Sequence, residues 1–222
     1  IEGTINNQDS GTFVNIGTLT NRYNGVITNP GTIDNRESFI NFGTISSTGI
    51  LTNKTTGSFT NNLTINNNVG GTFTNKGPFL NNSTGTLNSY ATVINDSSVV
   101  SYGNVKLYKT SNFTNNNLIE NRNILRNYGT LINNKDFKTY HSSAYDNYNA
   151  FTNNSNGTVT NNSVFINKKI NSTNYQIDTY KKKIFEGFVA LTLSNLFNRN
   201  YQEVAGYTTF GRNISMSYKK DF

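Results

Sequence analysis

Large apolar residues recur at intervals of six or eight residues along most of this 222-residue chain. There are 25 of them between Ile5 and Phe165, and every one has an odd number. Side chains of an extended chain alternate between two faces, so an even step always returns to the same face. A helical period would instead distribute these residues around an axis. The spacing therefore predicts short strands whose apolar side chains share one interior.

An asparagine follows two residues after the apolar residue in 20 of the 25 units, as in GTFVN at residues 11–15. Its parity is the same, so the amide is expected to point inward, where it is costly unless its donors and acceptors are paired. Units stacked at the strand spacing of about 4.8 Å allow such amides to bond along the stack, as in an asparagine ladder. The expected ladder residues are Asn15, Asn21, Asn29, Asn35, Asn41, Asn53, Asn61 and Asn75.

The repeat predicts an all-β fold, a parallel β-solenoid or β-helix over residues 1–171, in which neighbouring rungs complete one another's core. Asparagine after each strand and glycine before the next are expected to turn the chain, because both tolerate positive φ. The 14-residue spacing of the glycines at positions 43, 57, 71 and 85 favours two sides locally. We expect three sides, in a coil of about 20 residues, because two sides leave little interior for phenylalanine and isoleucine.

Composition limits the classes of protein to be considered. Asparagine, threonine and glycine make up over a third of the chain, a bias also found in disordered tracts, but the regular apolar residues argue against disorder. The absence of cysteine excludes disulfides and thiolate metal sites. The single histidine, His141, is expected at the surface, and no metal or cofactor is expected. The net charge of +7 is spread thinly apart from lysines 181–183, so we expect no nucleic-acid partner.

The sequence offers few groups for catalysis. Acid–base chemistry needs titratable groups that converge on a cleft. Asp34 and Glu37 near Arg36 are the least implausible carbohydrate-cleaving cluster, but solvated corner charges are the favoured interpretation. We therefore expect no enzyme. No apolar run approaches the roughly 20 residues of a membrane helix, and the start at Ile1, with neither Met nor a signal peptide, predicts a processed or truncated product.

Threonine is the one repeated outward residue. Thr-x-Thr pairs flank the inward residue in three units, and on a flat face they could present an ice-like array of hydroxyl and methyl groups. The competing explanation is that β-branched residues suit strands. Ice binding is therefore a weaker alternative function. Its expected residues are Thr18, Thr20, Thr72, Thr74, Thr158 and Thr160.

The amino-acid sequence of the repeat resembles that of a known group of proteins. Units such as GTLTN (residues 17–21) and GTVTN (residues 157–161) are similar to the Asn/Thr/Gly-rich β-helical repeats of bacterial surface adhesins, including autotransporter-like and filamentous-haemagglutinin-like proteins. The resemblance covers residues 1–171. It implies a rigid shaft or filament at the bacterial cell surface, extracellular or in the outer membrane. Such a shaft would contact glycans, surfaces or other copies of itself.

Residues 172–222 have a different composition and are expected to form two or three antiparallel strands. The segment 191–222 resembles the C-terminal strands of TonB-dependent outer-membrane receptors, through NLFNRNY at residues 195–201 and a last strand that ends in Phe. Phe210 stands where that family commonly has Pro. In the last strand one parity is apolar, as in a lipid-facing strand of an outer-membrane barrel. These residues are Ile214, Met216, Tyr218 and Phe222.

The second resemblance implies outer-membrane association. It also leaves open an alternative function, as part of a receptor for uptake of a siderophore or another nutrient. Whether the repeat and the C-terminal segment belong to one natural protein stays open as well.

Overall fold

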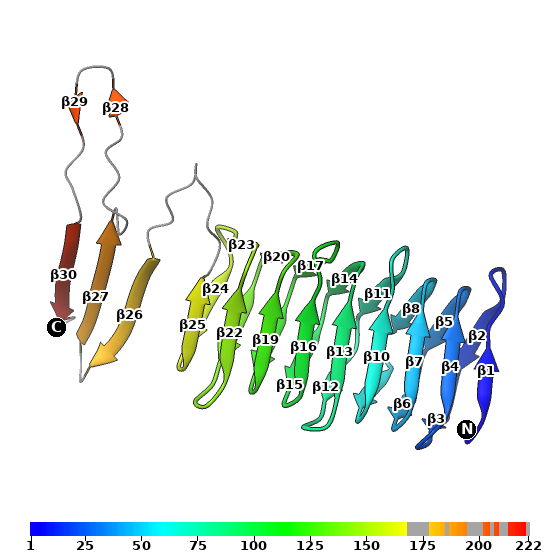
Figure 1. The fold of residues 1–222 in the computed structure, drawn as a ribbon. Helices are drawn as coiled ribbons and strands as arrows, with labels where there is room; N and C mark the ends of the chain where they lie inside the picture. The colour runs from blue at the N-terminus through cyan, green and yellow to red at the C-terminus, as the bar shows by residue number, and fades with distance from the viewer. Residues whose placement is uncertain (168–177, 185–186, 195–201, 205–206, 209–212, 221–222) are drawn as a thin grey trace. The chain divides into compact units, whose positions relative to one another are not determined.

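The computed structural model describes residues 1–167, 178–184, 187–194, 202–204, 207–208 and 213–220. The chain divides into two compact units, Ile1–Lys169 and Ile170–Phe222. In the first unit, short parallel strands form three sheets, and the chain visits the sheets in turn (Figure 1). The predicted parallel β-solenoid and its three sides are thus confirmed. One passage through all three sheets is called a rung below.

Each sheet takes every third strand of the solenoid. Sheet A contains β1 (Thr4–Asn6), β4 (Val26–Asn29), β7 (Thr44–Ser47), β10 (Thr64–Asn67), β13 (Thr86–Ser89), β16 (Asn104–Leu107), β19 (Ile124–Asn127), β22 (Ala144–Asn147) and β25 (Val164–Asn167). Sheet B contains β2 (Thr12–Asn15), β5 (Thr32–Asn35), β8 (Ile50–Asn53), β11 (Thr72–Asn75), β14 (Thr92–Asn95), β17 (Asn112–Asn115), β20 (Thr130–Asn133) and β23 (Ala150–Asn153). Sheet C contains β3 (Thr18–Asn21), β6 (Ser38–Asn41), β9 (Ser58–Asn61), β12 (Phe79–Asn81), β15 (Ser98–Ser101), β18 (Leu118–Asn121), β21 (Asp136–Thr139) and β24 (Thr158–Asn161).

Equivalent positions of successive rungs lie directly opposite each other. Phe39 pairs with Phe59 in sheet C, and Asn53 pairs with Asn75 in sheet B. Equivalent asparagine residues are 18, 20 or 22 residues apart. The variation arises at the corners, most of which contain either two residues, as between β4 and β5, or four, as between β10 and β11. Both lengths are even, so every strand keeps the same side chains inward.

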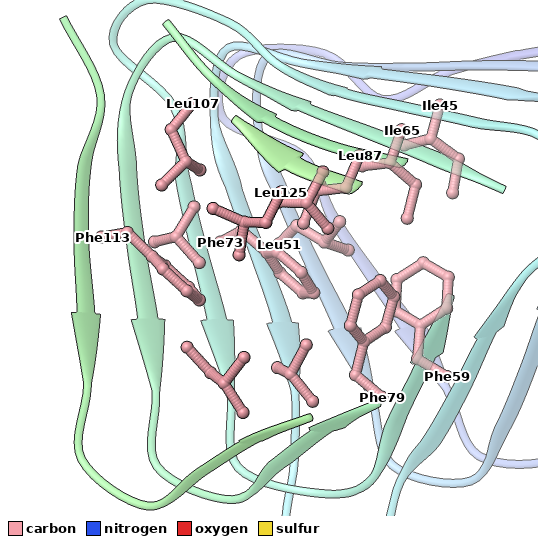
Figure 2. Close-up of a cluster of buried hydrophobic side chains, with 14 of the residues drawn as sticks. Ile45, Leu51, Phe59, Ile65, Phe73, Phe79, Leu87, Leu107, Phe113 and Leu125 are labelled. Atoms are coloured by element: carbon pink, nitrogen blue, oxygen red, sulfur yellow. The ribbon is translucent and has the colours of Figure 1, made fainter. Parts of the chain in front are cut away.

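The apolar residues fill the space between the sheets, as Figure 2 shows. Phe39 and Phe59 stack at a centroid distance of 4.5 Å, and Phe59 and Phe79 meet edge to face at 5.5 Å. Of the 25 predicted inward residues, 19 are fully buried. The other six belong to the first or last rung, which has a neighbour on one side only. Five of these are partly buried, Ile5, Phe13, Leu19, Phe151 and Phe165, and Val159 is 37% exposed.

The glycines before the strands have a different role from the predicted one. A Cβ on Gly49 would lie 2.0 Å from the carbonyl oxygen of Gly31, and one on Gly57 would lie 2.5 Å from that of Asn35. Positive φ within the described residues is confined to Asn24, Gly70 and Ser142. The expectation that these glycines supply positive φ is therefore wrong. Glycine is required because the backbone of the neighbouring rung leaves no room for a side chain.

The second unit contains antiparallel strands. β27 (Gly187–Ser194) pairs with β26 (Asp178–Ile184) on one side and with β30 (Asn213–Lys220) on the other. β28 (Gln202–Val204) pairs with β29 (Tyr207–Thr208).

Candidate binding surfaces

Three ladders of inward, mainly polar side chains run along the solenoid, one at the end of the strands of each sheet, and Leu107 interrupts the ladder of sheet A. The ladder of sheet B is unbroken from Asn15 to Asn153: each Nδ2 donates to the Oδ1 of the next rung at 2.7 to 2.9 Å. The predicted asparagines are distributed over all three ladders. Asn15, Asn35, Asn53 and Asn75 lie in sheet B, Asn21, Asn41 and Asn61 in sheet C, and Asn29 in sheet A.

The ladder amides also bind the corner backbone. Besides its ladder bond, Asn35 Nδ2 donates to the carbonyl oxygens of Glu37 at 2.9 Å and Ser58 at 3.0 Å. Glu37 lies in the corner between β5 and β6 and Ser58 is the first residue of β9, so one amide connects the corner to the next rung. Because the side chain of Asn35 is fully buried, the ladder stabilises the fold and offers nothing to an external ligand.

Serine interrupts two of the ladders, with a consequence for the next rung. Ser101 Oγ accepts from Asn81 Nδ2 at 3.0 Å but donates to the carbonyl oxygen of Gly103 at 3.0 Å. The Oδ1 of Asn121, one rung further, is consequently buried without a hydrogen bond. Ser47 likewise accepts from Asn29 and donates to the carbonyl oxygen of Gly49, so the Oδ1 of Asn67 is buried without a hydrogen bond.

The six threonines of the predicted ice-like array do not come together. Thr18 and Thr20 lie on β3 and Thr158 and Thr160 on β24, which are the two edge strands of sheet C. Thr72 and Thr74 lie on β11, in sheet B. The repeat pattern by itself does not bring these threonines together, because the three-sided winding places only every third unit in the same sheet.

Sheet B nevertheless presents a regular outward face. From β8 to β23 its outward positions are uncharged and stack in register in two ranks. The outward positions of sheets A and C carry charged residues over the same rungs, such as Lys106, Arg126 and Glu120. The first rank of this face consists of Ile50, Thr72, Thr92, Asn112, Thr130 and Ala150, and the second of Thr52, Thr74, Ile94, Thr114, Ile132 and Thr152.

A row of tyrosines follows the corner between sheets A and B. Tyr90, Tyr108, Tyr128 and Tyr148 each come directly after the strand of sheet A in four successive rungs. Tyr90 and Tyr108 stack at 3.9 Å between ring centroids, and Tyr128 and Tyr148 stack at 4.4 Å. Lys106 Nζ lies over the rings of Tyr108 and Tyr128, at 4.6 and 5.8 Å from their centroids. We call these four residues the tyrosine corner.

The hydroxyls of the tyrosine corner also interact. A hydrogen bond from Tyr90 to Tyr108 raises the pKa of Tyr90. The same bond and the ammonium group of Lys106 lower the pKa of Tyr108, against the effect of partial burial. The tyrosine corner was absent from the sequence predictions, although its signal is visible: a tyrosine after the ladder position in every third unit.

A hollow adjoins the N-terminal end of the tyrosine corner. It is open, has a volume of about 470 Å³ and is lined by Thr48, Asn66, Asn68, Val69 and Tyr90. It arises because the positions equivalent to Tyr90 in the two preceding rungs hold the smaller Thr48 and Asn68. The hollow thus lies where the row of tyrosines begins.

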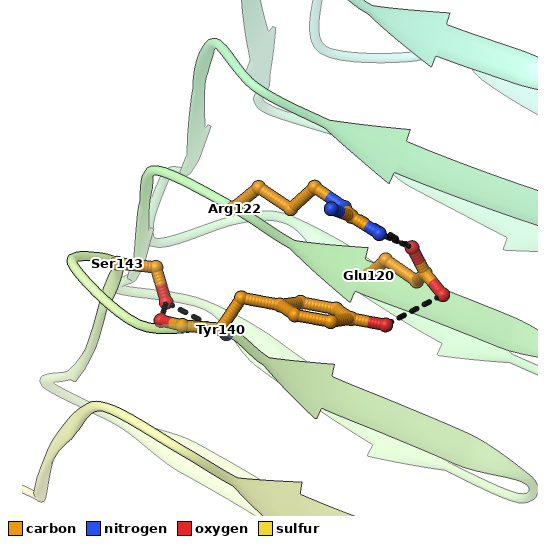
Figure 3. Close-up of polar contacts among 4 residues, drawn as sticks. All are labelled: Glu120, Arg122, Tyr140 and Ser143. Atoms are coloured by element: carbon orange, nitrogen blue, oxygen red, sulfur yellow. Dashed lines mark hydrogen bonds and ion pairs between the residues drawn. The ribbon is translucent and has the colours of Figure 1, made fainter.

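The corner between sheets C and A carries a second aromatic cluster, shown in part in Figure 3. The guanidinium of Arg122 lies 4.1 Å from the ring centroid of Tyr140 and 5.3 Å from that of Tyr102, in the rungs on either side. Glu120 accepts from Arg122 at 2.8 Å and from the hydroxyl of Tyr140 at 2.9 Å. Ser143 holds the backbone of Tyr140, since its hydroxyl donates to the Tyr140 carbonyl oxygen at 2.6 Å.

Charge pairing sets the ionisation of this cluster. Burial by itself would raise the pKa of Glu120, but the hydrogen bonds from Arg122 and Tyr140 outweigh it and lower the pKa. The bond to Glu120 raises the pKa of Tyr140. The contacts of Arg122 and Glu120 within the cluster connect three successive rungs, which indicates a structural clamp.

Other titratable groups considered in the sequence are dispersed. Asp34 pairs with Lys54 at 3.2 Å and with Arg36 at 3.7 Å, while Glu37 is exposed at the corner. His141 is exposed in a corner, as expected. Within the described residues, no three His, Cys, Asp or Glu side chains gather in a group able to hold a metal ion.

The residues that carry the receptor resemblance are only partly described. Ile214, Met216 and Tyr218 lie in β30, whereas Phe222 and the NLFNRNY segment lie outside the described residues. Membrane association of this segment therefore stays a prediction. The described part of the chain contains no helical segment with the length and hydropathy of a membrane span.

Comparison of the chain with family models, with curated proteins and with solved structures gives no match in any of the three. The resemblance to surface adhesins accordingly rests on the sequence of the repeat and on the β-solenoid fold.

Proposed function

We propose that this protein is a structural and adhesive solenoid of the bacterial cell surface, a rigid shaft that contacts glycans, surfaces or other copies of itself without catalysing a reaction. The observation that carries the proposal is the unbroken axial stack. Every strand from β4 to β22 pairs in register on both sides, and the ladder of sheet B ties eight rungs together. Such a stack resists bending because each rung is hydrogen-bonded to its neighbours along the whole perimeter.

The geometry of the outer surface supports contact rather than chemistry. The described solenoid presents rows of repeated side chains, on sheet B and at two corners, and each row extends over several rungs. Repeated rows suit ligands that are themselves repetitive, because several weak contacts formed together give a high avidity.

Surface location is tested by labelling the cells that make the protein. An antibody against the solenoid should label intact cells as strongly as permeabilised cells, and an externally added protease should remove the label. Labelling restricted to permeabilised cells would contradict the proposal. A cytoplasmic protein labelled in parallel verifies that the cells are intact.

The uncharged face of sheet B favours a second candidate function, ice binding. Its two ranks consist mainly of threonine and isoleucine, with Asn112 and Ala150 as the exceptions, and repeat at the strand spacing of about 4.8 Å. Their β-branched side chains are restricted at χ1, so hydroxyl and methyl groups are held in fixed positions. A crystalline water surface requires a rigid, periodic partner of this kind.

Ice binding is measured as thermal hysteresis and inhibition of ice recrystallisation by the full chain. Thr74→Lys places a charge in the middle of the sheet B face and should abolish both effects. Thr60→Lys is the matched control, because it places the same charge outward on sheet C. The candidate fails if the unmodified chain has neither effect or if both variants lose it equally.

A further inference from the structure

We propose that the hollow beside Tyr90 is a subsite for one ring of a neutral sugar within a glycan chain. This inference rests on the proposed function, in which the solenoid contacts glycans, and it names the place of contact and the class of ligand.

Tyr90 provides an aromatic platform with one open face. Tyr108 covers the face of Tyr90 toward the next rung, at 3.9 Å between ring centroids. The hollow lies against Tyr90 on the side of the preceding rungs, which contribute Thr48 and Asn68. Stacking on Tyr108, with the two rings 14° from parallel, fixes the orientation of the Tyr90 ring. The flat, apolar face of a pyranose ring can therefore pack on a surface that is already in place.

Two amides beside the platform supply polar groups of opposite kind. Asn66 Oδ1 accepts from Asn88 Nδ2 at 3.0 Å, and Asn68 Nδ2 donates to Ser46 Oγ at 2.8 Å. Each amide thus uses one half of its side chain, and neither Asn66 Nδ2 nor Asn68 Oδ1 has a hydrogen bond within the described residues. A donor and an acceptor remain available. Vicinal sugar hydroxyls both donate and accept, so they match this pair.

The charge of the lining selects among sugars. Thr48, Asn66, Asn68, Val69 and Tyr90 are all uncharged. The carboxylate of a uronic or sialic acid would lose hydration in the hollow without gaining a cation as partner, which is unfavourable. The lining therefore favours neutral hexoses over acidic sugars.

The affinity of one subsite should be low. The hollow is open and offers a single ring and two amide groups, so we expect a dissociation constant on the order of 1 mM for a monosaccharide. A surface protein present in many copies reaches useful strength by binding several rings of one polysaccharide at once. Weak binding at one subsite is thus compatible with adhesion.

The test is saturation-transfer NMR on the full chain with three probes: methyl β-D-glucopyranoside, cellotetraose and methyl β-D-glucuronide. The two neutral probes should receive saturation at their ring C–H protons, and the glucuronide should receive little. Tyr90→Ala should weaken binding of cellotetraose at least tenfold. Tyr128→Ala is the matched control, because it removes a tyrosine of the same corner that does not line the hollow.

Further variants separate binding from folding. Tyr90→Phe keeps the ring and should retain most of the binding, and Asn68→Ala should reduce it while the ring remains. Equal losses in Tyr90→Ala and Tyr128→Ala, or no saturation transfer to either neutral probe, would overturn the subsite. If the protein labels intact cells but binds no neutral sugar, the subsite fails and the surface role stands.

Discussion

At the scale of single residues, a ladder asparagine acts through both ends of its amide. In sheet B each amide donates to the following rung and accepts from the preceding one, so the side chains form a continuous chain of hydrogen bonds. Removal of one member takes a hydrogen bond from each of its two buried neighbours, so its cost exceeds that of one ordinary hydrogen bond.

We expect Asn75→Ala to lower the free energy of unfolding by about 2–4 kcal/mol. The variant removes the ladder acceptor of Asn53 Nδ2 and the ladder donor of Asn95 Oδ1, and it leaves a cavity between the two amides. Chemical denaturation measures the change. Lys76→Ala is the control because Lys76 is the exposed neighbour, and its effect should stay within about 0.5 kcal/mol. A similar result for both variants would show that the ladder contributes little.

Ser101→Asn should stabilise the protein, by about 1–2 kcal/mol. An asparagine at this position can donate to the Oδ1 of Asn121, which at present is buried without a partner. The ladder position accommodates Asn in the preceding rung, at Asn81. Thermal unfolding of Ser101→Asn beside Ser98→Asn, an outward substitution on the same strand, checks the prediction. A destabilised Ser101→Asn would indicate that the ladder is too narrow at this rung.

The inward asparagines could be predicted from parity alone, because parity fixes the face of an extended residue. The unpaired oxygens could not. They depend on whether the hydroxyl of Ser101 donates along the ladder or to the corner carbonyl of Gly103, and the sequence does not distinguish these two acceptors.

At the scale of strands and corners, the sequence predicts where the strands lie more completely than which side chains meet at the corners. Tyr90 and Tyr102 both follow a ladder position, yet they lie on different corners of the solenoid. Only the three-sided winding separates them and places Tyr90 against Tyr108 and Tyr102 against Arg122. The stacks at the corners, and the hollow at the end of one stack, therefore depend on the number of sides in each rung.

The Arg122 corner gives the solenoid a pH-dependent contribution. The pKa of Glu120 is lowered in the folded protein, so folding favours the ionised carboxylate. This stabilisation is complete above the ordinary pKa of a glutamate and is lost as the pH falls through the lowered pKa. Denaturation midpoints between pH 3 and 7 should therefore separate the unmodified protein from Glu120→Gln at neutral pH and converge in acid. A constant difference across this range would contradict the prediction, and Arg122→Gln should reproduce the convergence.

At the scale of the whole molecule, stability is distributed along one axis. The described part of sheet A has nine strands, and at a spacing of about 4.8 Å their stack spans roughly 40 Å. Each rung contacts its neighbours and little else, as in other repeat proteins. The described residues of the outer rungs have partners on one side, and their apolar residues are accordingly less buried.

Hydrogen exchange of the full chain should therefore vary smoothly along the solenoid. Amides of β10 to β16 should exchange most slowly, and those of β1 to β3 should exchange fastest, because opening an end rung breaks contacts on one side only. Peptide-resolved mass spectrometry measures the gradient. Uniform protection from β1 to β22 would mean that the solenoid opens as one cooperative unit.

The two corner lengths carry a consequence for how such a chain can change over generations. Corners of two and four residues occur side by side, and both preserve the inward parity of every later strand. Mutations that insert or delete residues in pairs at a corner are therefore tolerable, whereas the loss of a single residue turns the following strand inside out. Sequences descended from this one should differ in length at their corners by even numbers.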